Sequence, residues 1–106
     1  MPPVSYEYEV IHRPELGKFL IRLAPGTFAF LGYEIREGKM YITKTYTPPE
    51  FRGRGIATRL TDYAVNWARE NGYKIVPVCS FAVNYFKKNR ELQHLLDEEG
   101  FRALQG

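Results

Sequence analysis

The chain has 106 residues, of which 44% are hydrophobic and 25% are charged, and its formal net charge is +3. This composition is typical of one soluble globular domain spanning residues 1–106, and the mild basicity permits an anionic ligand without requiring one. A single cysteine excludes an intrachain disulfide framework, and no apolar run approaches the ~18 residues of a membrane span. The first ten residues do not resemble a secretory signal, so a cytoplasmic protein is expected.

The first half of the chain predicts four strands joined by short turns. Apolar and polar side chains alternate in residues 6–13 and again in 18–23, with the turn sequence PELG between them. An aromatic-rich segment follows at 27–36, and a segment with several β-branched residues at 40–47. Because short turns join antiparallel neighbours, this half is expected to form a four-stranded antiparallel meander.

The second half changes to helical periodicity. In residues 54–71 the apolar positions recur at steps of three and four, which predicts an amphipathic helix that ends at Asn71-Gly72. The residues expected on its buried face are Ile56, Leu60, Tyr63, Ala64, Trp67 and Ala68. A short apolar strand at 74–78 comes after this helix, so it is expected to pair in parallel with the fourth strand.

The C-terminal part predicts one or two further helices. Ser80 is expected to cap the first of them, over 80–89. Residues 90–100 are expected to form a third short helix with Leu92, Leu95 and Leu96 pointing inward. The element order therefore indicates an α+β fold whose sheet carries one parallel junction near its end.

The stretch PPEFRGRGIATRL, residues 48–60, joins the fourth predicted strand to the long helix. Gly53 and Gly55 allow positive φ and a close approach of the backbone to a ligand. The first N–H groups of a helix have no intrahelical partner and, with the helix dipole, favour an anion, to which Arg52 and Arg54 add positive charge. From the residues alone, a phosphate-binding loop and a turn with a solvated basic rim both remain open.

Cys79 follows the short apolar strand and precedes a predicted helix. A free cysteine is most often an inert core residue. Its place at the carboxyl end of a parallel strand, however, is where ligands bind in α/β sheets, and a helix start favours the thiolate form.

Lys87, Lys88 and Arg90 form a basic cluster that is compatible with a solvated helix face or with a second phosphate contact. His12 and His94 lie too far apart in the sequence, without other ligands nearby, to predict a metal site.

Two segments together resemble the GCN5-related N-acetyltransferase superfamily. TYTPPEFRGRGIATRL resembles its motif A, in which Q/R-x-x-G-x-G/A matches residues 52–57. NGYKIVPVCSFAVNYFKKN resembles a small single-domain branch of the superfamily that carries a P-x-C-S-[FY] segment followed by an aromatic residue. The matching positions are Pro77, Cys79, Ser80, Phe81 and Tyr85. The likeness covers about residues 28–96.

The resemblance implies a protein that binds acetyl-CoA and transfers acetyl to an amine of a small molecule or protein. Backbone amides near 54–58 would hold the pyrophosphate, and strand ends near Thr45 and Val78 would hold the pantetheine arm, with a backbone N–H near Val78 stabilising the oxyanion. Cys79 is the candidate nucleophile and Tyr85 a candidate acid. The residues implied to bind acetyl-CoA are Thr45, Arg52, Gly53, Arg54, Gly55, Ile56, Ala57, Thr58, Val78, Ser80, Tyr85 and Lys88.

Several alternatives stay open at this level. Many members of the branch carry His-Thr where this chain has Lys44-Thr45, which argues against a role for an imidazole near the acetyl group. Many also carry proline where this chain has Arg90, a difference that concerns the path of the C-terminal segment and contacts to the CoA ribose. Direct transfer and a Cys79 acyl-enzyme are both compatible with the residues, and so is a CoA-binding module without turnover. A nucleic-acid binder is disfavoured because basic residues and exposed aromatics do not alternate on one strand face. A monomer or weak dimer is expected.

Overall fold

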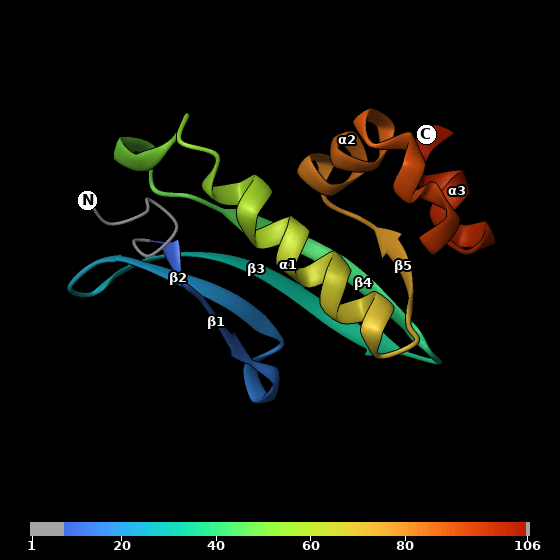
Figure 1. The fold of residues 1–106 in the computed structure, drawn as a ribbon, viewed down its shortest axis with the longest axis horizontal. Helices are drawn as coiled ribbons and strands as arrows, with labels where there is room; N and C mark the ends of the chain where they lie inside the picture. Colours follow the sequence, from blue (N-terminus) through green and yellow to red (C-terminus); the bar gives the residue numbers. More distant parts are fainter. Residues whose placement is uncertain (1–7, 106) are drawn as a thin grey trace.

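A five-stranded sheet in the order β1-β2-β3-β4-β5 is the frame of the protein (Figure 1). The structure is a computed structural model that describes residues 8–105. The strands are β1 (Val10–Arg13), β2 (Lys18–Ala24), β3 (Thr27–Arg36), β4 (Lys39–Tyr46) and β5 (Lys74–Pro77). Neighbours among β1 to β4 are antiparallel and β4 pairs with β5 in parallel, as the sequence predicts. Residues 6 and 7 of the predicted first strand lie outside the described part of the chain.

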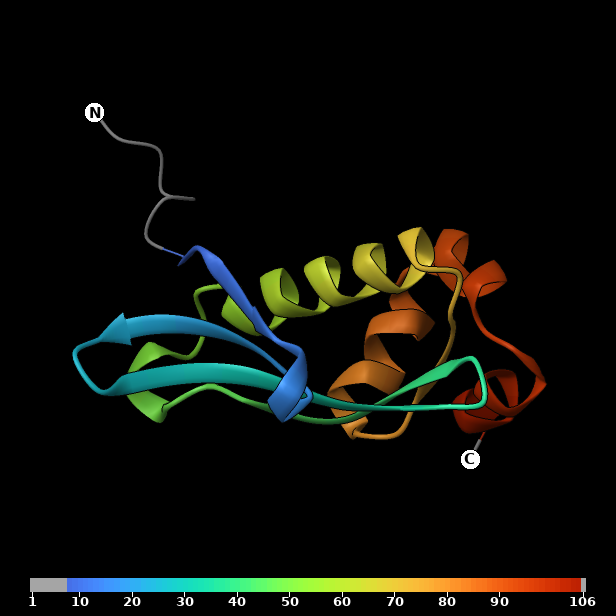
Figure 2. The same ribbon diagram turned by 90° about the horizontal axis from the view of Figure 1, so that it is seen from below.

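Helices cover one face of this sheet. The α-helices are α1 (Ile56–Glu70), α2 (Ser80–Lys88) and α3 (Glu98–Gln105), and the 3-10 segments are η2 (Pro14–Leu16), η3 (Pro49–Phe51) and η4 (Arg90–Leu95). Figure 2 shows α1 and α2 on the same side of the strands, whereas α3 lies beside the end of the sheet that carries β5. Over residues 8–105, no helix is both long enough and apolar enough to span a membrane.

Helix α1 buries most of the predicted face. Its buried residues are Ile56, Leu60, Thr61, Ala64, Val65 and Ala68. The expectation that Tyr63 is buried is wrong, because its side chain is 43% exposed. With 3.6 residues per turn, Thr61 and Val65 shift the centre of the buried stripe away from Tyr63. The buried Thr61 hydroxyl donates to the Ala57 carbonyl at 2.8 Å, so its polarity costs little.

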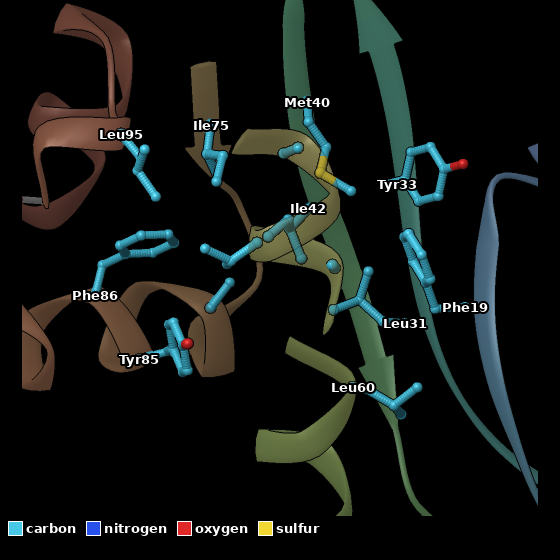
Figure 3. Close-up of a cluster of buried hydrophobic side chains, with 14 of the residues drawn as sticks. Phe19, Leu31, Tyr33, Met40, Ile42, Leu60, Ile75, Tyr85, Phe86 and Leu95 are labelled. Carbon is cyan, nitrogen blue, oxygen red and sulfur yellow. The ribbon is translucent and has the colours of Figure 1, made fainter. Parts of the chain in front are cut away.

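One hydrophobic core joins α1, α2 and the sheet (Figure 3). Leu60 of α1, Phe86 of α2, Ile42 of β4 and Ile75 of β5 are all fully buried in it. Burying each of these side chains contributes about 1.5–3 kcal/mol. The helices are therefore held rigidly against the strands on which the candidate site is built.

The C-terminal segments differ from the prediction in two respects. Ser80 is the first residue of α2, and the N-cap is Cys79, which makes no side-chain capping hydrogen bond. The predicted third helix is divided into η4 and α3. At the start of α3, Asp97 accepts a hydrogen bond from the Gly100 N–H at 2.9 Å. Leu95 and Leu96 are buried as predicted, whereas Leu92 is half-buried.

A charged network fixes α3 to the sheet. The Lys39 ammonium lies 2.8 Å from Asp97 and 3.3 Å from Glu99, and the Tyr41 hydroxyl donates to Glu99 at 2.8 Å. Burial alone would raise the pKa of Asp97, but hydrogen bonds from Lys39 and the Gly100 N–H outweigh it and hold the pKa below 3.8. The Tyr41 hydrogen bond, with Lys39, holds the pKa of Glu99 below 4.5.

Acid is expected to weaken this attachment. Because both carboxyl pKa values are depressed by folding, their contribution is complete above the unfolded values of 3.8 and 4.5 and is lost as the pH falls through the folded values. The free energy of unfolding, from denaturant titrations at a series of pH values, should fall below about pH 4.5. Asp97→Asn should make that fall shallower. Glu98→Gln, an exposed neighbour paired only with Arg102, is the control, and an unchanged profile in Asp97→Asn would contradict the prediction.

Candidate active site

The candidate site begins where β4 and β5 separate. Strand β4 carries a bulge at Thr43, because Gly32 pairs with Lys44 while Tyr33 pairs with Ile42. The parallel ladder ends at the pair Ile42–Pro77. There the Ile42 carbonyl accepts hydrogen bonds from the N–H groups of both Val78, at 2.9 Å, and Cys79, at 3.2 Å.

Beyond Ile42, strands β4 and β5 diverge (Figure 1). Residues 43–46 of β4 continue alongside β3, and the segment after β5 turns into α2. Within the described residues, this part of β4 is paired on one side only. An edge of this kind presents unpaired N–H and C=O groups that can bind an extended ligand.

The start of α1 faces the same region. Gly55 is its N-cap, with φ of 76° in the left-handed region, and Gly53 has φ of 82°. Glycine offers no side-chain capping group, and the first turn of the helix contains no acidic residue. Its first N–H groups are therefore available to an external anion, and the helix dipole favours one.

A cleft of about 470 Å³ connects these features. Its lining comes from the end of β4, from η3 and the loop after it, from the start of α1 and from the first turn of α2. The lining residues are Thr45, Tyr46, Thr47, Phe51, Arg52, Gly53, Gly55, Ile56, Ala57, Thr58 and Phe81. Arg52 is held in the loop by donating from its Nε to the Thr47 carbonyl at 2.9 Å.

Seven residues implied to bind acetyl-CoA therefore meet around one cleft. They are Thr45, Arg52, Gly53, Gly55, Ile56, Ala57 and Thr58. The sequence reasoning missed Tyr46, Thr47, Phe51 and Phe81 as lining residues. Phe51 and Phe81 belong to the two motifs on which the resemblance rests, so reading the aromatic positions of those motifs as ligand contacts would have found both.

Other predicted residues lie beside the cleft and do not line it. The Arg54 guanidinium stacks over the Phe51 ring, 5.1 Å from its centroid. Val78 is 54% exposed, and its N–H is already bonded to Ile42, so it does not serve as a free oxyanion donor in this structure. Ser80 and Lys88 are exposed at opposite ends of α2, about 12 Å apart along the helix axis.

Cys79 is half-buried between β5 and α2. Its side chain packs against the edge of the core and is absent from the cleft lining. Phe81, two residues later, does line the cleft. The structure thus places the cysteine next to the site without directing it into the open space.

Tyr85 is placed between the two helices. The residue is buried, and its hydroxyl donates to Asp62 of α1 at 2.5 Å. Burial, followed by this hydrogen bond to a carboxylate, raises the pKa of Tyr85 far above 10.0, so the phenol is neutral at physiological pH. It lines a separate groove of about 360 Å³ between α1 and α2, which shares no lining residue with the cleft.

The comparisons with known proteins agree with this geometry. A family model described as GCN5-related N-acetyl-transferase matches residues 18–95, which is most of the chain. The chain belongs to the GCN5-related N-acetyltransferase family. It is also similar to the NMR solution structure of a GCN5-like protein from Staphylococcus aureus that is predicted to be an N-acetyltransferase. That match has 27% identity and a TM-score of 0.70, and it covers 86% of this chain and 89% of the other.

Membership of this family confirms the superfamily predicted from the sequence, and the shared fold confirms the predicted α+β class. The matched region includes the bulge in β4, the loop before α1 and all of α2. The whole cleft therefore belongs to the part of the chain that is similar to the family.

Removing the Tyr85 hydroxyl tests its structural role. Tyr85→Phe should lower the free energy of unfolding by about 1.5–3 kcal/mol, because the bond to the Asp62 carboxylate is lost. Thermal or denaturant unfolding measures the loss. Tyr46→Phe, with an exposed ring, is the control and should unfold like the parent chain. A Tyr85→Phe protein as stable as the parent would show that this hydrogen bond is not important to the fold.

Proposed function

We propose that this chain is an acetyl-CoA-dependent N-acetyltransferase and that the cleft at the start of α1 binds acetyl-CoA. The observation that carries the proposal is the meeting of two different binding elements in one cleft. One is an uncapped helix start with Arg52 beside it, and the other is the free edge of β4. A ligand that is anionic at one end and amide-bearing along an extended arm matches both.

The residues fit each part of such a ligand. The amides at the start of α1 would bind the diphosphate, for which the absence of a side chain at Gly55 leaves room: nothing lies within 4 Å of where its Cβ would be. The free edge of β4 would pair with the amides of the pantetheine arm. Phe51, Ile56 and Phe81 supply the apolar part of the lining.

When bound, acetyl-CoA supplies an acetyl group activated as a thioester. The protein must then bind the acceptor amine in its neutral form, because an ammonium has no lone pair with which to attack the thioester. No histidine, lysine or acidic residue is among the described residues that line the cleft. We therefore infer that the amine loses its proton to water or through desolvation on entering the site.

Direct transfer is the favoured route. Cys79 packs against the core and does not line the cleft, whereas a nucleophile must reach the reacting carbon. An acyl-enzyme would require the Cys79 side chain to turn toward Phe81 before it could accept acetyl. The rival function, a CoA-binding module without turnover, shares the binding residues and differs only in product formation.

Binding at the helix start is tested with two glycine variants. Gly55→Ala should weaken CoA binding tenfold or more, because the methyl group enters the space needed by the diphosphate. It should also cost about 1–2 kcal/mol of stability, because φ is 76°. Calorimetric titration with CoA measures the affinity.

Gly72→Ala is the matched control for strain. Gly72 has the same φ and an equally open Cβ position, but it lies after the other end of α1. It should lose similar stability and keep the affinity of the parent chain. Equal CoA affinities in the two variants, or no measurable CoA binding by the parent chain, would contradict the assignment of the site.

Turnover is tested with the full chain, acetyl-CoA and a panel of amines and peptides. Release of free CoA that depends on an amine is expected, and Cys79→Ala should keep most of it under direct transfer. Mass spectrometry should then show no acetyl adduct on Cys79. An adduct together with an inactive Cys79→Ala variant would establish the acyl-enzyme route instead. CoA binding without amine-dependent release across the panel would support the non-catalytic module.

A further inference from the structure

The sheet face opposite α1 and α2 carries an ordered set of cations and aromatic rings. Residues that pair directly across neighbouring strands point to the same side of a sheet. Arg13 pairs with Lys18, Lys18 with Gly32, and Gly32 with Lys44. These pairs form a row across four strands in which three of the four residues are cationic.

A second row lies next to the first. It consists of Ile11, Leu20, Phe30 and Tyr46, again joined by direct pairing across β1 to β4. Beyond it, Arg22 pairs with Phe28. We name these two rows, with Arg22 and Phe28, the open face. Among the described residues no helix covers it, and Figure 2 shows this side of β1 to β4 bare.

The aromatic side chains of the open face remain accessible. Phe28 and Tyr46 are 38% and 39% exposed. Phe30 lies 5.8 Å from Tyr46, and the ammonium groups of Lys18 and Lys44 lie 4.7 and 5.8 Å from its ring centroid. Both ammonium groups lie over the Phe30 ring, so Phe30 holds the cations in place. The exposed rings of Phe28 and Tyr46 are the ones on which a further planar group could stack.

The charge of the open face is not neutralised internally. In the part of the chain that the structure describes, Arg13, Lys18, Arg22 and Lys44 take part in no salt bridge. Glu34, an acidic residue farther along the same side of β3, is paired with Arg36 at 3.5 Å. Four positive charges of the open face thus have no acidic partner among the described residues.

We propose that the open face binds single-stranded nucleic acid. Phosphates would contact the four cations of the open face, and unpaired bases would stack on its exposed aromatic side chains, which is how sheet surfaces hold single strands without sequence preference. An acidic peptide would use the cations but would leave the rings without a planar partner. A duplex would offer phosphates but no free base faces.

This proposal reverses the expectation drawn from the sequence, for a structural reason. Within any one strand, cations and exposed aromatics do not alternate in the way that would indicate a nucleic-acid-binding surface. The pairing register places Lys18 of β2 and Lys44 of β4 on either side of Phe30 of β3, so the pattern exists only across strands.

The charge contribution is tested with the full chain and a fluorescently labelled 20-nucleotide oligothymidylate in anisotropy titrations over a range of salt. Four phosphate contacts predict a slope of log K against log salt of about −3, at roughly −0.7 for each contact on a single strand. Lys18→Gln should make the slope shallower by about 0.7. Lys87→Gln makes the same change in charge at an exposed position of α2, outside the open face, and should leave the slope unchanged.

The stacking contribution is tested with Phe28→Leu, because Tyr46 also lines the cleft. Binding should weaken about tenfold, as expected for the loss of one stacked base, while the melting temperature and CoA affinity stay those of the parent chain. Phe101→Leu, which changes an aromatic residue of similar exposure on α3, is the control and should bind normally.

Three results would overturn the proposal. One is the absence of oligothymidylate binding at low salt. The second is equal affinity for a duplex of the same length, with no loss in Phe28→Leu, which would indicate plain electrostatic attraction. The third is tighter binding of poly-glutamate than of the oligonucleotide, which would assign the open face to an acidic protein. None of these outcomes bears on CoA binding in the cleft.

Discussion

The separation of β4 from β5 beyond Ile42 is the constraint on which the rest of the structure depends. Two successive N–H groups, of Val78 and Cys79, share the Ile42 carbonyl, and the bulge at Thr43 shifts the register of β4 at the same level. Strand pairing cannot continue past this point, so β4 retains a free edge. That edge and the helix start become two walls of one cleft.

The helices around the cleft stay in place because of packing elsewhere. Leu60 and Phe86 bind α1 and α2 into one core, and the Tyr85–Asp62 hydrogen bond joins the two helices directly. The candidate site can therefore use an uncapped helix start and two left-handed glycines, features that reduce local stability, because the fold is held together by contacts outside the site.

The two faces of the sheet differ in what they carry. The covered face supplies the core and, at its end, the cleft that we propose binds acetyl-CoA. The open face presents cations and rings to solvent. Lys44 lies at the boundary between the two faces. Many members of the resembled branch have histidine at this position, but here the Lys44 ammonium lies over Phe30 on the open face. Thr45, the next residue, lines the cleft.

Local patterns in the sequence by themselves determined the element order, the parallel junction, the glycine loop at the start of α1 and the family. Each of these depends on spacing between near neighbours, such as the 3.6-residue period or the turn at Asn71-Gly72. Only the tertiary structure decided that Tyr85 faces Asp62, that the N–H of Val78 is hydrogen-bonded to Ile42, and that Lys18 and Lys44 both lie over Phe30. Those facts depend on strand register and on how far the buried stripe of each helix is rotated, and both are set by packing between segments distant in the sequence.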